Sequence, residues 1–140
     1  MTNRALTEIL RRQVPLTMRP DATLREAARA MADRGVGAVL VTDAAGCLLG
    51  IVTGRDAVRA LAEAEAPGAL TLDRVMTRNP ATLGPDGTAI EALRLMADCG
   101  CRHIPVVAAG KVAGIVSRGD FRGLELDRLD EETGLWERIA

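Results

Sequence analysis

The spacing of hydrophobic residues changes along the chain, from a helical period to runs that are apolar almost throughout. Residues 3–12 place three apolar side chains on one helical face, which predicts a short amphipathic helix that ends before Pro15. A second helix is predicted from an N-cap at Asp21 or Thr23 to Arg34. The residues expected on its buried face are Leu24, Ala27, Ala28 and Met31.

An apolar run follows this helix. Gly35 is the expected left-handed C-cap, and residues 36–42 predict a strand that is buried on both faces, since nearly all of its side chains are apolar. The further elements expected are a hairpin turn at residues 43–46, a returning strand at 47–53, a helix from Gly54 to about Glu65, a linker at 66–70 and one helical turn at 72–76.

The same pattern then begins again, because the chain contains two copies of one unit. Residues 20–44 align with residues 85–109 at an offset of 65, with 12 identities in 25 positions. One residue is dropped in the second hairpin, and residues 46–56 then align with residues 110–120 with five identities. Turns tolerate such length changes, so the slip fits two copies of one fold.

Each copy is predicted to form an extended segment, a helix, a strand, a hairpin, a strand and a helix. Such a sheet leaves one apolar face uncovered, and packing two copies through their sheets would cover it. We therefore predict an α/β (α+β) fold of two pseudo-symmetric β-α-β-β-α repeats with small mixed sheets. The predicted divisions are residues 1–66, residues 67–130 and a tail at 131–140. Apolar residues towards the C-terminus either pack on the core or form an oligomer or partner surface.

Composition and charge make some classes of function less plausible for this protein. The only aromatic residues are Phe121 and Trp136, so the core must be aliphatic. The formal net charge is −1, from 18 basic and 19 acidic residues, and no basic block stands out. With few aromatic rings to stack on bases, nucleic-acid binding is disfavoured. Neither a signal peptide nor a membrane-spanning run is visible, so we expect a cytoplasmic protein.

Three cysteines occur in the chain, and this small, odd number does not predict a disulfide framework. Cys99, Cys101 and His103 alternate, and a strand would place all three on one face as candidate zinc ligands. A glycine and a proline interrupt that strand, however. The simpler interpretation makes the two thiols small apolar side chains where a helix enters a buried strand.

Two strand-to-helix junctions carry the candidate chemistry, Thr53-Gly54-Arg55-Asp56 and Ser117-Arg118-Gly119-Asp120. Free N–H groups at a helix N-terminus suit a phosphate, and an aspartate there can accept hydrogen bonds from the two hydroxyls of a ribose. Arg55, Arg102 and Arg118 add positive charge nearby. A helix cap explains either copy by itself, so a cap and a ribonucleotide site are both open interpretations.

The residues around the second junction resemble a known family. The run Cys101-Arg102-His103-Ile104-Pro105-Val106-Val107, followed by residues 110–120, is similar to the signature of the cystathionine-beta-synthase (CBS) domain. Arg74-Val75-Met76-Thr77 ahead of Pro80-Ala81-Thr82 is similar to it as well. Two copies in tandem resemble a CBS pair, or Bateman module, over residues 7–130. Pairs in this family bind adenosine ligands, such as AMP, ADP, ATP, NAD or S-adenosylmethionine, in clefts between the repeats.

The resemblance implies roles for the matching residues of this chain. The two aspartates would contact ribose, and Thr53 and Ser117 would contact ribose or phosphate. Residues near the base would be Thr17, Thr82, Val39 and Ile104, and residues near phosphate would be Arg102 and His103. The full candidate ligand-binding set is Thr17, Val39, Thr53, Arg55, Asp56, Thr82, Arg102, His103, Ile104, Pro105, Ser117, Arg118 and Asp120.

The two copies also differ from each other. The first has Gly37-Ala38-Val39-Leu40 where the second has Arg102-His103-Ile104-Pro105, and the arginines of the two junctions stand at different places. We therefore expect two unequal sites, with the better phosphate site around Asp120. For His103 by itself, a hydrogen bond to backbone is the more common role of a lone histidine beside a strand.

The leading hypothesis is a regulatory module that binds an adenine nucleotide, forms a homodimer and acts on an unknown regulated protein. No cofactor is required, and no catalytic residue is expected, because the sequence offers no nucleophile with a visible base. The alternative is a structural or protein-interaction module with degenerate sites. A third hypothesis is a thiol or metal sensor built on Cys99, Cys101 and His103.

Overall fold

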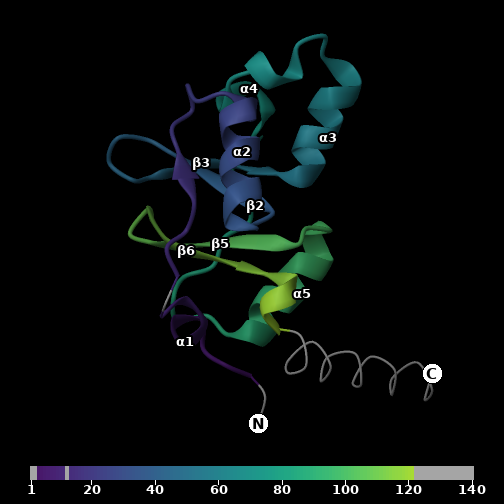
Figure 1. The fold of residues 1–140 in the computed structure, drawn as a ribbon. Coiled ribbons are helices and arrows are strands. Elements are labelled where there is room, and N and C mark those ends of the chain that lie inside the picture. Colours follow the sequence, from purple (N-terminus) through teal and green to yellow (C-terminus); the bar gives the residue numbers. More distant parts are fainter. Residues whose placement is uncertain (1–2, 12, 122–140) are drawn as a thin grey trace, which may run out of the picture. The chain divides into compact units, whose positions relative to one another are not determined.

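The chain divides into two compact units, which a computed structural model describes at residues 3–11 and 13–121 (Figure 1). The first-repeat unit contains residues 14–80 and the hairpin end 107–112. The second-repeat unit contains, among the described residues, 3–11, 13, 81–106 and 113–121. The N-terminal helix thus belongs to the same unit as the second repeat. The division expected near residue 66 follows the repeats in the sequence, and it stays a prediction.

The first-repeat unit is built on a four-stranded sheet in the order β1-β2-β3-β4. The β1–β2 pair is parallel, and the other two pairs are antiparallel, so the sheet is mixed as predicted. In chain order the elements are β1 (Thr17–Met18), α2 (Leu24–Arg34), β2 (Ala38–Thr42), β3 (Leu48–Thr53), α3 (Gly54–Glu63), the 3₁₀ turn η1 (Pro67–Ala69), α4 (Leu72–Val75) and β4 (Thr77–Arg78).

The core of this unit lies between the sheet and its helices. Figure 1 shows α2 and α3 beside the strands, and one apolar cluster joins residues of both helices to two alternate residues of β2 and to Val52 of β3. The strand β4 packs closely on β3, since a Cβ on Gly50 would lie 2.7 Å from the carbonyl oxygen of Thr77. The buried members of the cluster are Leu24, Ala27, Met31, Val39, Val41, Val52, Ala60 and Leu72.

Three sequence expectations for this unit are corrected. Ala28 is exposed, because the buried stripe of α2 is narrow and runs through residues at positions i, i+3 and i+7. The strand β2 begins at Ala38 rather than Val36, because the Val36 N–H still donates to the Met31 carbonyl as part of the helix cap. The helix α3 ends at Glu63, two residues earlier than expected.

The remaining elements are α1 (Leu6–Leu10), α5 (Ala89–Cys99), β5 (His103–Ala108), β6 (Lys111–Ser117) and the 3₁₀ turn η2 (Arg118–Phe121). They belong to the second-repeat unit, apart from the hairpin end of β5 and β6 at residues 107–112. The N-terminal segment is tied to the start of α5, since the Leu6 N–H donates to the Gly87 carbonyl and the Ala89 N–H to the Arg4 carbonyl. Side chains from every element of this unit enter one core, and Leu6, Leu93, Ile104 and Phe121 are fully buried there.

The two repeats have equivalent caps at both ends of their first helices, α2 and α5. Thr23 and Thr88 each accept a hydrogen bond from a glutamate N–H three residues later, and Gly35 and Gly100 each close the helix with a positive φ, of 65° and 68°. These corners are the N-cap and the left-handed C-cap that the sequence predicts. The predicted duplication and the α/β class with small mixed sheets are confirmed.

One strand differs between the repeats, and Pro105 accounts for it. In the first repeat the Leu40 N–H donates to the Leu16 carbonyl, which helps β1 to pair with β2. The corresponding residue is Pro105, which has no N–H, so the parallel pairing shrinks to a single bridge between Leu83 and Val106.

The predicted tail at 131–140 lies outside the described residues. Among the described helices, none is long and apolar enough to cross a membrane.

Candidate functional site

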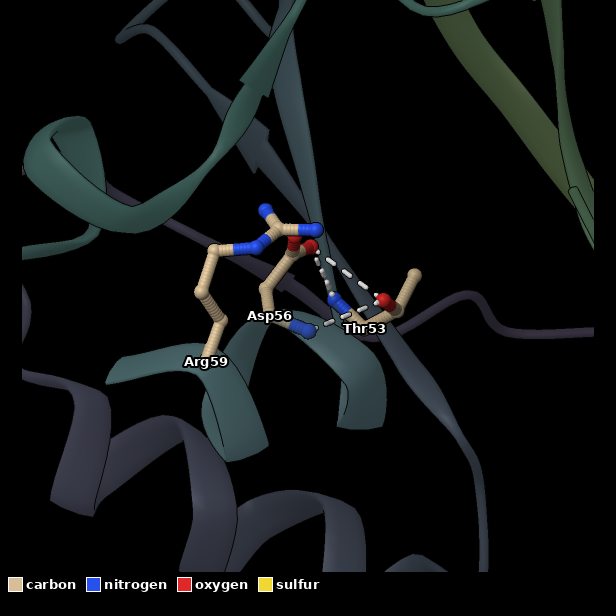
Figure 2. Close-up of polar contacts among 3 residues, drawn as sticks. All are labelled: Thr53, Asp56 and Arg59. Carbon is tan, nitrogen blue, oxygen red and sulfur yellow. Dashed lines mark hydrogen bonds and ion pairs between the residues drawn. The ribbon is translucent and has the colours of Figure 1, made fainter. Parts of the chain in front are cut away.

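At the first junction, the strand β3 ends at Thr53 and the helix α3 begins at Gly54. The Asp56 carboxylate accepts a hydrogen bond from the Thr53 N–H at 2.9 Å, and the Thr53 hydroxyl oxygen accepts one from the Asp56 N–H at 3.4 Å. The Thr53 hydroxyl also donates to the same carboxylate oxygen at 3.2 Å. Figure 2 shows this reciprocal capping box, which satisfies the first orphan donors of the helix.

The second oxygen of Asp56 is occupied as well. Arg59 Nη1 donates to Asp56 Oδ1 at 3.4 Å, and the aspartate is only 5% exposed (Figure 2). Arg59 was absent from the candidate set, although its place three residues after Asp56 on a helix is a local signal for such a pair. Both carboxylate oxygens of the first junction therefore have partners from the chain itself.

At the second junction, β6 ends at Ser117 and the 3₁₀ turn η2 follows. The Ser117 N–H donates to Asp120 Oδ2 at 2.7 Å, which matches the Thr53–Asp56 bond of the first junction. Within residues 3–11 and 13–121, the structure records one hydrogen bond to this carboxylate, and Asp120 is half-buried. The backbone of Asp120 is held from a distant segment, since Arg4 Nη2 donates to its carbonyl oxygen at 2.8 Å.

His103 interacts electrostatically with this second junction. Burial lowers the pKa of His103 below its usual 6.5, the negative charge of Asp120 raises that pKa, and the positive charge of Arg102 lowers it. Burial is the largest of these causes, so the imidazole is neutral at pH 7. A phosphate group beside the ring would favour the protonated form, which carries two N–H donors.

The candidate residues of the first-repeat unit fall into two groups. Thr17 is exposed in β1, where it pairs with Leu40, and Arg55 is exposed in the first turn of α3. Val39 is fully buried in the core cluster, so its side chain is not available to a ligand. The unit brings Thr53 and Asp56 into direct contact and leaves the side chain of Val39 facing the core.

The candidate residues of the second-repeat unit divide in the same way. Ile104 is fully buried in the core, and Pro105 is buried with its carbonyl oxygen accepting from the Leu83 N–H at 3.2 Å. Thr82 and Arg102 are exposed, and Arg118 is half-buried. The Arg118 N–H donates to the Arg102 carbonyl at 3.0 Å, which joins the start of β5 to the second junction.

The cysteines correct an expectation. Cys99 and Cys101 are joined by a disulfide, with their Cα atoms 5.4 Å apart, where the sequence suggested two small apolar thiols. The residue between them is a glycine in the left-handed conformation, and this brings the flanking side chains to the same side of the corner. Cys47 is a free thiol. In the part of the chain that the structure describes, no three histidine, cysteine or acidic residues gather as a metal site would need.

Two stretches of the chain, residues 6–63 and 72–127, match the family model of the CBS domain. The chain belongs to the CBS domain family. The matched stretches include both junctions, and they cover most of the 140 residues as a tandem pair. The resemblance that the sequence suggested is thereby confirmed.

Relatives and solved structures agree with this assignment. The chain is 44% identical over 108 residues to the CBS domain-containing protein CBSCBSPB2 of Arabidopsis thaliana, which covers 76% of the chain and 20% of that relative. It thus spans about a fifth of the length of that curated relative. The CBS domain protein PAE2072 from Pyrobaculum aerophilum, solved in complex with AMP, superposes with a TM-score of 0.80 at 25% identity, covering 93% of this chain and 98% of that one.

A second similar structure holds different adenosine compounds. The CBS domain pair of protein MJ0100, solved with 5′-methylthioadenosine and S-adenosyl-L-methionine, has a TM-score of 0.76 at 27% identity and covers 92% of this chain and 97% of that one. This CBS pair is therefore similar to proteins whose structures contain adenosine ligands.

Proposed function

We propose that this CBS pair is a regulatory module that binds an adenine nucleotide without catalysing a reaction, and that its site at Asp120 binds more tightly than its site at Asp56. The observation that carries the proposal is the difference between the two carboxylates. Asp120 is half-buried and accepts a single hydrogen bond from the described residues, whereas Asp56 is buried and accepts bonds on both oxygens.

A ribose fits the second carboxylate. The Oδ1 atom of Asp120 can accept a hydrogen bond from a ribose hydroxyl while Oδ2 keeps the Ser117 N–H, so binding would not break the junction. Arg102 and His103 supply positive or protonatable groups for a phosphate in the same unit. The related structures with AMP and with S-adenosyl-L-methionine support adenosine as the common part of the ligand.

A thermal-shift screen tests the proposal. AMP, ADP, ATP, NAD and S-adenosylmethionine are each added to the protein, with GMP as the control for a nucleotide with a different base. A ligand at a hundred times its dissociation constant stabilises the folded protein by about 2.7 kcal/mol, which raises the melting temperature by several degrees. We expect at least one adenosine compound to do so and GMP to have a smaller effect. A flat response to every adenosine compound at millimolar concentration would contradict the proposal.

The helix α3 favours an interaction surface as a second function. Val58 and Leu61 lie three residues apart on this helix and are 67% and 69% exposed, so they form a small apolar stripe on its surface. We propose that this stripe forms the interface of the expected homodimer, because burying it against a second copy removes the apolar area from water.

Light scattering on a sizing column tests the dimer. The double substitution Val58→Glu with Leu61→Glu introduces charges into the stripe, and we expect it to convert a dimer into a monomer. Val14→Glu is the matched control, since Val14 is 74% exposed and lies outside α3. A monomeric wild-type protein, or a double variant that remains dimeric, would exclude the stripe as the interface.

A further inference from the structure

The disulfide between Cys99 and Cys101 lies at the corner where α5 ends and β5 begins. Gly100 between them is the C-cap of the helix, and the Gly100 and Cys101 N–H groups both donate to the Met96 carbonyl. Cys99 is exposed to solvent, whereas Cys101 is half-buried and packs against the core of its unit. Cys99 is therefore the more accessible of the two bonded residues.

The first repeat shows that this corner does not need a disulfide. The residues at the same places are Arg34, Gly35 and Val36, and they form the same left-handed cap, with the Val36 N–H donating to the Met31 carbonyl at 3.0 Å. A bridge across a single residue also removes little chain entropy from the unfolded state, because the stabilisation falls with the size of the closed loop. The disulfide is therefore not a structural staple.

The reduced form is accommodated equally well. The Cys99 sulfur lies 3.8 Å from the Met96 carbonyl oxygen, so the thiol that reduction produces has an acceptor within reach. Cys101 is small and apolar as a thiol, and it can remain against the same core residues. Disulfides that are exposed and unnecessary for the fold are the ones that exchange readily and serve regulation.

From these features we infer that Cys99 and Cys101 form a reversible thiol–disulfide switch, and that its state adjusts the second junction. The inference is specific to the second repeat, since the first repeat has no sulfur at either place. Its effect on nucleotide binding rests on the function proposed above, whereas the thiol chemistry does not.

The exchange partner is a small or protein dithiol, and it supplies the two electrons that reduce the bond. A thiolate of the dithiol attacks the sulfur of Cys99, the Cys99–Cys101 bond breaks, and the Cys101 sulfur leaves and takes up a proton. The second thiol of the partner then attacks the mixed disulfide and releases Cys99, which also takes up a proton. Two electrons and two protons reach the protein, and the partner becomes a disulfide. Oxidised glutathione reverses the step in two exchanges.

Covalent and hydrogen-bonded neighbours connect the switch to the candidate site. Arg102 follows Cys101 directly, and its carbonyl oxygen accepts the Arg118 N–H at 3.0 Å. Arg118 is the first residue of η2, the turn that carries Asp120. The next residue, His103, interacts electrostatically with both Asp120 and Arg102. A change in the backbone at the corner therefore reaches the groups that would hold ribose and phosphate.

His103 provides a readout that needs no ligand, because it is the only histidine in the chain. Protein without a histidine tag is prepared with excess dithiothreitol or with oxidised glutathione, alkylated to count free thiols, and examined by NMR through the imidazole ring signal. In a Cys47→Ser background, which removes the free thiol, we expect no alkylated thiol and no glutathione adduct in the oxidised protein and two alkylated thiols in the reduced protein. We also expect the His103 signal to occupy different positions in the two states.

Two variants complete the experiment. The double substitution Cys99→Ser with Cys101→Ser should give one His103 signal position under both treatments, while Cys47→Ser, the matched control, should keep two. If oxidised glutathione leaves Cys99 and Cys101 open to alkylation or glutathionylated, the switch is excluded. If the disulfide forms but the His103 signal does not move, the link to the second junction is excluded. Nucleotide affinity measured in both states then tests the regulation separately, and equal affinities would exclude it without touching the thiol chemistry.

Discussion

The two strand-to-helix junctions of this CBS pair start from the same short pattern, a hydroxyl residue with an aspartate three residues later, and they end in different states. In both, the hydroxyl residue's N–H donates to the aspartate, at 2.9 Å in the first and 2.7 Å in the second. In the first, the box is completed by the return bond to Thr53 and by Arg59. In the second, the turn is 3₁₀ and the bond from Ser117 stands alone among the described residues.

Small sequence differences produce this contrast. Arg55 and Gly54 of the first junction are exchanged for Gly119 and Arg118 in the second, and the place of Arg59 is taken by Gly123, which has no side chain to pair with a carboxylate. A duplicated motif can thus serve chiefly as a helix cap in one copy and leave an acceptor oxygen for a ligand in the other. The same asymmetry extends to His103 and to the disulfide, which the first repeat lacks.

The largest expected effect comes from removing one charge at the second junction. Asp120→Asn keeps an oxygen for the Ser117 N–H but loses the charge-assisted bonds to a ribose, so the affinity for the adenine nucleotide should fall roughly ten- to hundred-fold. Asp56→Asn is the matched control, and it should leave the dissociation constant of the tighter site within about two-fold of the wild-type value. Isothermal titration calorimetry measures both. If Asp56→Asn weakens binding more than Asp120→Asn, the comparison between the junctions is reversed.

The two aspartates should rank in the opposite order for stability, with substitution of Asp56 costing more than substitution of Asp120. Asp56→Ala removes the acceptor for the Thr53 N–H and leaves Arg59 without its partner, so the free energy of unfolding should fall by about 2 kcal/mol, whereas Asp120→Ala should cost about 1 kcal/mol or less. Arg59→Ala should cost only about 0.5 kcal/mol, because its side chain is 57% exposed. Urea unfolding measures all three, and equal losses for the two aspartate variants would show that the caps are equivalent.

The smallest expected effect is a dependence of stability on pH that belongs to the second repeat. Burial holds the pKa of His103 below 6.5 in the folded protein, so the unfolded chain binds a proton more readily. The free energy of unfolding therefore keeps its full value above pH 6.5, where His103 is neutral in both states. It decreases as the pH falls from there through the folded pKa, because the unfolded chain takes up the proton first. His103→Gln should flatten this part of the profile of melting temperature against pH. An unchanged profile would mean that other groups cause the acid sensitivity.

Local features of the fold could be predicted from the sequence. The duplication, the caps at Thr23 and Gly35 and the box at Thr53 and Asp56 each depend on residues within a few positions of one another, and all are present. The Asp56–Arg59 pair could also have been predicted, because its spacing on the helix is local.

Features that depend on contacts between distant parts of the chain could not be predicted in this way. The Arg4 side chain reaches the Asp120 carbonyl across 116 positions, and the N-terminal helix packs into the core of the second repeat. No periodicity in either segment specifies the other. The burial of Val39 and Ile104 was clear from their apolar strands, but which face of the strand meets the core depends on register, and this decides whether a side chain is available to a ligand.

The most direct test of the unequal junctions is a crystal structure of the protein grown with one molar equivalent of AMP. With too little ligand for two sites, the nucleotide occupies the tighter one. We expect the ribose hydroxyls to lie within hydrogen-bond distance of the Asp120 carboxylate and the phosphate near Arg102 and His103, with the Asp56–Arg59 pair intact. Density for AMP on Asp56 with the Asp120 junction empty would contradict the account.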